Sequence, residues 1–180
     1  TVLGSLGIAG FSNYNQTQVL QTSADEMVTM LNFAKSRAQS QIKPSGCNGV
    51  LEGYSVIIDT NDKSYALYSK CSLQNDPAIV SGQKRSMPSG LSFALDSQES
   101  FFFPIQEGGV RVAGNIVICN SAEKARTIAV NSLGLVGVHS SDCAVPVLSP
   151  TPAPTGVATP AVTFTPTPIL TQTPTLTVTP

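Results

Sequence analysis

The sequence predicts an α+β fold: a long N-terminal amphipathic helix packed on an antiparallel β-sheet, followed by an extended Pro/Thr-rich C-terminal tail. Apolar residues recur at helical spacing over residues 17–42. Short runs rich in Val, Ile, Tyr and Phe, separated by turn residues, follow up to residue 143. All charged residues, 10 Lys+Arg and 11 Asp+Glu, lie at or before Asp142, and residues 144–180 hold 9 of the 13 prolines. The charge and proline distribution therefore separates a folded core from a tail.

The 180 residues divide into three predicted parts. Residues 1–16 are the end of an apolar helical segment, residues 17–143 form a head domain, and residues 144–180 form the tail. A core of roughly 140 residues buries enough apolar surface to fold alone. The net charge of −1 argues against a dedicated nucleic-acid binder, which usually has a basic excess.

One stripe of the predicted helix over residues 17–42 is expected to be buried. Its small and apolar positions step by four and three along the chain, which places them on one face: Leu20, Ala24, Met27, Leu31, Ala34 and Ala38. Acidic residues come early in this helix and basic ones late, as the helix dipole favours. Pro44 and Gly46 end the pattern.

The start of the helix has two interpretations. Ser23 and Glu26 would form a capping box and begin it there. Alternatively the helix enters from residues 1–11, which are uncharged and lack proline, and we favour this second start. Glycines at every third position, Gly4, Gly7 and Gly10, each cost up to about 1 kcal/mol of helix stability. The N-terminal end is therefore the weakest part of the helix.

Residues 1–11 are too few to span a bilayer, which needs about 20 apolar residues. Two interpretations fit them: the second half of a longer apolar segment, or a segment that packs against its own domain. The sequence composition does not distinguish these two.

The strands are predicted in two hairpins with a variable stretch between them. Residues 54–60 and 64–71 pair around Asn61-Asp62. Residues 72–89 contain Pro77, Gly82 and Pro88 and are predicted to be a loop. Residues 91–95 and 101–103 are short apolar runs.

The second hairpin joins residues 115–119 to residues 126–130, and a last strand covers residues 135–138. The total is six or seven short strands after one helix, which is an α+β pattern.

Four cysteines allow three pairings. We favour Cys47–Cys71 and Cys119–Cys143. The first hairpin brings Cys71 opposite the residues just after Cys47, and Cys143 closely follows the last strand. Free buried thiols in a cytosolic protein are the alternative. No C-x-x-C pair is present and His139 is the only histidine, so we expect no metal site and no cofactor.

The order of these elements resembles type IV pilins and pseudopilins. The segment from Thr1 to Tyr14 is similar to the second half of their apolar N-terminal helix. Gly10 lies about where many pilins carry a helix-kinking proline. The remaining core resembles the GspH/FimT branch, on motifs that lie in the same order: Ala34-Lys35-Ser36-Arg37-Ala38, Phe103 with Gly108, Ile116-Val117-Ile118-Cys119, and residues 126–130 followed by Gly134.

This resemblance implies a filament subunit. The chain would be anchored in the inner membrane before assembly and would then form an extracellular, cell-surface helical homopolymer with itself and other pilins. An apolar helix on a soluble head must be buried in membrane or against copies of itself, and contacts that do not close give helical filaments. The expected assembly residues are Val2, Leu3, Leu6, Ile8 and Phe11.

Two alternatives share the resemblance. One is a minor pseudopilin of a type II secretion system. The other is a FimT-like minor pilin that binds DNA or a surface. FimT-like proteins are associated with arginine after the glycine of the last strand, but residues 134–138 contain none, so we expect no nucleic-acid partner. The remaining candidate phosphate contacts are few, and acidic residues offset them: Lys84, Arg85, Arg111, Lys124 and Arg126.

The tail and the lone histidine complete the expectations. Proline and threonine at the density of residues 144–180 favour extended conformations. We favour a flexible tail or linker over an ordered role. Such tracts are also typical of O-glycosylated stalks, so the tail threonines are candidate glycan sites. His139 precedes Ser140, Ser141 and Asp142, but sequence neighbours do not make a catalytic triad. We expect no enzyme activity.

Overall fold

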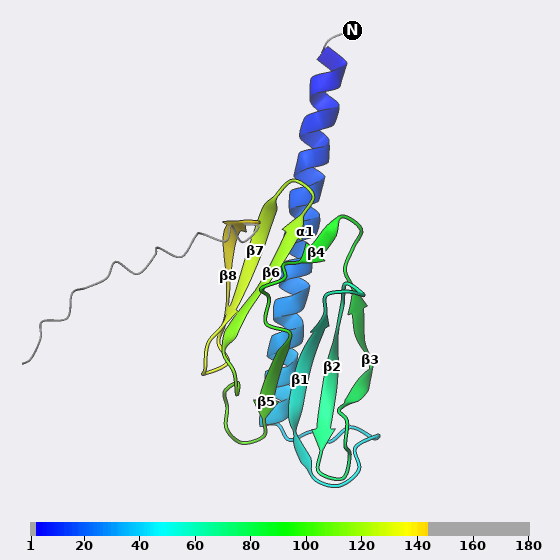
Figure 1. Ribbon diagram of the computed structural model, residues 1–180, viewed down its shortest axis with the longest axis vertical. Coiled ribbons are helices and arrows are strands. Elements are labelled where there is room, and N and C mark those ends of the chain that lie inside the picture. The colour runs from blue at the N-terminus through cyan, green and yellow to red at the C-terminus, as the bar shows by residue number, and fades with distance from the viewer. Residues whose placement is uncertain (1–2, 144–180) are drawn as a thin grey trace, which may run out of the picture. The chain divides into compact units, whose positions relative to one another are not determined.

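The computed structural model describes residues 3–143, and side chains from Tyr14 onward. These residues belong to one compact unit. One helix, α1 (Leu3–Gln39, 37 residues), precedes eight strands. Figure 1 shows α1 passing behind the strands and continuing, in blue, beyond their ends toward the N-terminus. The tail, residues 144–180, lies outside the described residues.

The strands form two four-stranded antiparallel sheets. Sheet A has the order β3-β2-β1-β5, and sheet B the order β4-β6-β7-β8. The bounds in sheet A are β1 Leu51–Asp59, β2 Ser64–Cys71, β3 Ala78–Ser86 and β5 Ser100–Pro104. Those in sheet B are β4 Leu91–Phe93, β6 Gly114–Asn120, β7 Lys124–Val130 and β8 Val136–Asp142. The α+β class is confirmed, but the structure has two sheets where one was expected.

The predicted buried stripe of the helix is confirmed. Its six residues are at most 2 % exposed and face the core. The helix contacts strands of both sheets: β1 and β5 in sheet A, and β6, β7 and β8 in sheet B. Helix α1 runs without a break through Ser23, so a start by a capping box at that residue is wrong and the upstream start is correct.

The helix ends at Gln39, three residues before the predicted end. Gln41 adopts a left-handed backbone with φ of 52°. The Gln41 amide donates to the Ala38 carbonyl, and the Ile42 amide donates to the Arg37 carbonyl. This pair of bonds is a Schellman cap, which satisfies carbonyls that the last helical turn leaves free.

The loop predicted for residues 72–89 is the main error at the level of elements. It contains β3, a nine-residue strand at the edge of sheet A. The pairing of β3 with β2 shifts between Ala66 and Tyr68, and Gly82 has φ of 73° in this stretch. The glycine and the flanking prolines made a bulged, mostly exposed edge strand look like a loop.

Aromatic and branched residues from both sheets fill the core against the helix. Tyr54, Phe101 and Phe103 are fully buried from sheet A, and Ile116, Ile118 and Ile128 from sheet B. The Tyr54 hydroxyl donates a hydrogen bond to the Ile42 carbonyl. The helix is therefore held along one side by two sheets from Leu20 to Ala38.

Candidate functional site

The expected assembly segment lies in the part of α1 that extends beyond the sheets (Figure 1). Leu3, Leu6, Ile8 and Phe11 fall within the helix, whereas Val2 lies outside the described residues. The whole stretch from Thr1 to Ala24 carries no charge. Among the described residues, no helix is long and apolar enough to cross a membrane. The polar run from Ser12 to Gln18 explains this, because it interrupts the apolar sequence.

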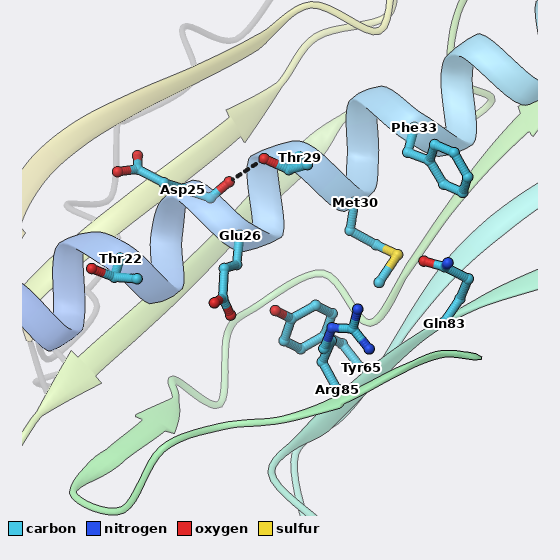
Figure 2. A pocket seen from close by; sticks show the side chains of 9 residues that line it. All are labelled: Thr22, Asp25, Glu26, Thr29, Met30, Phe33, Tyr65, Gln83 and Arg85. Atoms are coloured by element: carbon cyan, nitrogen blue, oxygen red, sulfur yellow. Dashed lines mark hydrogen bonds between the residues drawn. The ribbon is translucent and has the colours of Figure 1, made fainter.

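A hollow lies between α1 and the β2–β3 side of sheet A (Figure 2). Its volume is about 490 Å³. Glu26, Met30 and Phe33 line it from the helix, and Tyr65, Gln83 and Arg85 line it from the two strands. In sheet A, α1 packs mainly on β1 and β5, whereas the hollow adjoins β2 and β3 at the opposite edge of the sheet.

Charge in this hollow is concentrated around Tyr65. The Glu26 carboxylate, the Tyr65 hydroxyl and the Arg85 guanidinium converge there (Figure 2). Burial and the nearby negative charge of Glu26 raise the pKa of Tyr65 to about 12, and Arg85 partly opposes this shift. The Tyr65 ring also meets Phe93 edge to face, with ring centroids 6.4 Å apart. Tyr65 is therefore a neutral, fixed wall of the hollow at physiological pH.

This hollow was not predicted from the sequence. Met30 and Phe33 were not assigned a role, and Gln83 fell in the predicted loop. A signal was nevertheless present, because Thr22, Glu26, Met30 and Phe33 step by four, four and three along the helix.

The candidate phosphate contacts do not form one patch. Lys84 and Arg85 are neighbours in β3, where successive side chains point to opposite faces. Arg85 accordingly lines the hollow described above, whereas Lys84 lines a different one beside Asp59 and Glu99. Acidic side chains are thus close to both cations.

The other three candidate cations are also engaged locally. The Arg111 guanidinium lies 5.0 Å from the centroid of the Phe102 ring, beside sheet A. In sheet B, Lys124 forms an exposed ion pair with Asp142 at 3.2 Å, and Arg126 donates to the Ser140 hydroxyl. Only Lys124 and Arg126 share a strand and line one hollow between β7, β8 and α1.

Both predicted disulfides are present. Cys47–Cys71 and Cys119–Cys143 have Cα atoms 5.8 and 5.7 Å apart. Leu51 pairs with Cys71 in the β1–β2 register, which is the arrangement that favoured the first bridge. Cys143 follows β8 directly, and its amide donates to the Glu123 carbonyl, just before β7 at the same end of the β7–β8 pair. The second bridge therefore fixes the end of the head domain to β6.

Three motif positions of the resemblance meet in space. A Cβ built on Gly134 would lie 3.4 Å from the Phe103 ring and 3.4 Å from the Lys35 side chain. The Lys35 ammonium donates to the carbonyls of Leu133 and Gly134, at 3.0 and 3.1 Å. The helix, β5 and the β7–β8 turn are thus joined at one point, which gives these separated residues a common structural role.

His139 lies on β8 opposite Thr127. Within residues 3–143, no group of three or more His, Cys, Asp or Glu side chains is arranged to hold a metal ion.

Comparison with known proteins does not identify a family. The sequence matches no family model, and neither curated proteins nor solved structures give a significant match.

Proposed function

We propose that this chain is a structural subunit of an extracellular type IV pilus-like filament, a pilin that assembles through its N-terminal helix. Before assembly the same helix would anchor the subunit in the inner membrane. After assembly, copies of this chain and other pilins would bury it. In this proposal the chain acts by associating with other subunits and not by catalysing a reaction.

The observation that carries the proposal is the division of α1 into two parts. From Leu20 to Ala38 the helix buries a stripe against its own sheets. Its N-terminal part extends beyond the sheets and carries no charge. An isolated helix of this length, interrupted by glycines, is marginal in water. Burial against other subunits would supply the stabilisation that its own domain does not.

The head domain suits exposure outside the cell. Two disulfides, each closing a separation of 24 residues, tie the segment before β1 to β2 and the segment after β8 to β6. Such bridges persist in oxidising compartments and are rare in the cytosol. DNA binding remains the less favoured alternative, because the candidate cations occupy separate faces and have local partners.

The experiment that tests the proposal is shearing of surface appendages from the native cells, with quantification of this chain in the sheared fraction by mass spectrometry. If this chain dominates the sheared fraction and begins with a longer apolar helix, the result would support its assignment as a major pilin. A trace amount would instead support a minor pilin, and DNA-binding and adhesion assays would follow. Absence from the sheared fraction, with the chain retained in the envelope, would overturn the filament-surface proposal in favour of a secretion pseudopilin.

A further inference from the structure

A groove runs along α1, bordered opposite the helix by β2 and β3 at one end and by residues 88–91 and 120–121 at the other. The hollow of Figure 2 adjoins a second one of about 340 Å³, and the two share Thr22 and Glu26. The second hollow adjoins a third of about 240 Å³ and shares Val19 and Pro88 with it. We call these three hollows the α1 groove. Its helical wall extends from Asn15 to Phe33, which is about 27 Å at 1.5 Å per residue.

The helical wall of the groove has the spacing of a helix-packing seam. It is formed by residues that step by four, three, four, four and three along α1: Asn15, Val19, Thr22, Glu26, Met30 and Phe33. Alternating steps of three and four are the pattern by which two helices interlock side chains. The same steps continued toward the N-terminus reach Phe11, Ile8 and Gly4, so the seam extends onto the part of α1 beyond the sheets.

The charge of the groove varies along its length. The part nearest the N-terminus, between Asn15 and Thr22 on the helix and residues 88–91 and 120–121 opposite, carries no charged side chain. Charged side chains line the groove beyond Thr22: Asp25, Glu26 and Arg85 line the hollow of Figure 2, and Glu26 also borders the middle hollow. An uncharged occupant therefore fits the first part without leaving a buried charge unpaired.

We propose that the α1 groove receives residues 3–13 of a second copy of this chain. The inference rests on the proposed filament function and names the contact that builds it. Residues 3–13 are helical, uncharged and about 16 Å long, so they fit within the length of the groove. The hollows accept a ridge of side chains from a helix lying along the groove rather than a whole helix.

This contact fixes how far apart two copies lie along the helix axis. Residue 8 is the middle of the inserted segment, and the uncharged part of the groove wall, from Asn15 to Thr22, is centred between residues 18 and 19. This separation of about 10.5 residues along parallel helices corresponds to an offset of about 16 Å between the two copies. Because the segment and the groove are different surfaces, each copy offers both, and the contact repeats without closing.

The test uses the full chain in its native cells, with a photo-crosslinking benzoyl-phenylalanine at Thr22 inside the groove. Asn32 is the matched control, since it is an exposed residue of the same helix that lines none of the three hollows. We expect Thr22 to crosslink, in sheared filaments, to a peptide within residues 3–13 of another copy. The probe at Asn32 should not reach that peptide.

A second measurement uses charge. We expect Thr22→Lys to lower the yield of sheared filaments at least tenfold, and Asn32→Lys to leave it within twofold. Thermal unfolding of both variants checks that the head remains folded. If filaments form normally while Thr22 crosslinks to residues 144–180, to another head or to nothing, the groove proposal is overturned and the filament function stands. If the unaltered chain enters no filament, both the groove proposal and the filament function are overturned.

Discussion

Gly134 is the residue at which backbone conformation and packing restrict the sequence most clearly. Its φ of 66° lies in the left-handed region, and a Cβ there would press on Phe103 and Lys35 at 3.4 Å. We expect Gly134→Ala to lower the free energy of unfolding by about 1–2 kcal/mol, since the left-handed conformation costs that much for a residue with a side chain. Urea unfolding of the full chain measures it.

Gly46 is the matched control for that substitution. An added Cβ there meets nothing within 4 Å, so Gly46→Ala should change stability by less than about 0.5 kcal/mol. Equal losses of stability in the two variants would show that the contact of Gly134 with Phe103 and Lys35 does not contribute specifically to the stability of the fold.

Tyr65 makes the stability of the head depend on pH in the alkaline range. Its folded pKa, about 12, is above the ordinary value of 10.0, so folding favours the protonated form. The associated stabilisation is complete below pH 10 and is lost as the pH rises through 12. We expect Tyr65→Phe to make the fall in stability between these values shallower. Tyrosinate absorbance followed during unfolding at each pH measures this. An unchanged slope in the variant would contradict the assignment.

At the scale of elements, α1 is the part of the fold that periodicity predicts best. The stripe spacing identifies every fully buried helix position from Leu20 to Ala38 except Ser23 and Met30. The hairpins β1–β2 and β6–β7 were also predictable, because local turns and alternating residues specify them. The left-handed Gln41 that ends the helix has no sequence signal of its own, since glycine is the residue usually found there.

Strand β3 and the second sheet were not predictable in the same way. Strand β3 has an exposed, bulged sequence, and only its pairing with β2 makes it a strand. The separation into two sheets depends on pairing between strands that are far apart in the sequence. For example, β1 pairs with β5 as well as with β2. The α1 groove follows from that arrangement and was hidden for the same reason.

A substitution in the helix tests how much its buried stripe contributes. Leu31 is fully buried, so we expect Leu31→Ala to cost about 2–5 kcal/mol through lost apolar burial and the cavity left behind. Asn32→Ala, one position further on the exposed side, should cost less than about 0.5 kcal/mol. Urea unfolding compares the two. A small loss at Leu31 would indicate that the helix is only loosely attached to the sheets.

At the scale of the whole molecule, the two disulfides constrain the unfolded chain more than they shape the folded one. Each closes a loop of 24 residues, and loops of this size contribute about 3 kcal/mol each. We expect the double replacement Cys119→Ser with Cys143→Ser to lower the unfolding temperature by several degrees or more. Differential scanning calorimetry measures it. The unaltered chain in reducing buffer should show a still larger decrease, because both bridges are then open.

The Cys119–Cys143 bridge also has a mechanical consequence. A pulling force applied to the tail enters the head at Cys143, which is covalently bonded to β6. Strand β8 therefore cannot be peeled from β7 from its free end, and the load passes directly to the middle of sheet B. The chain between the cysteines, a sequence separation of 24 and roughly 80 Å when extended, stays shielded from extension until the bridge is reduced. A single molecule stretched by its tail should lengthen by that amount only after reductant is added.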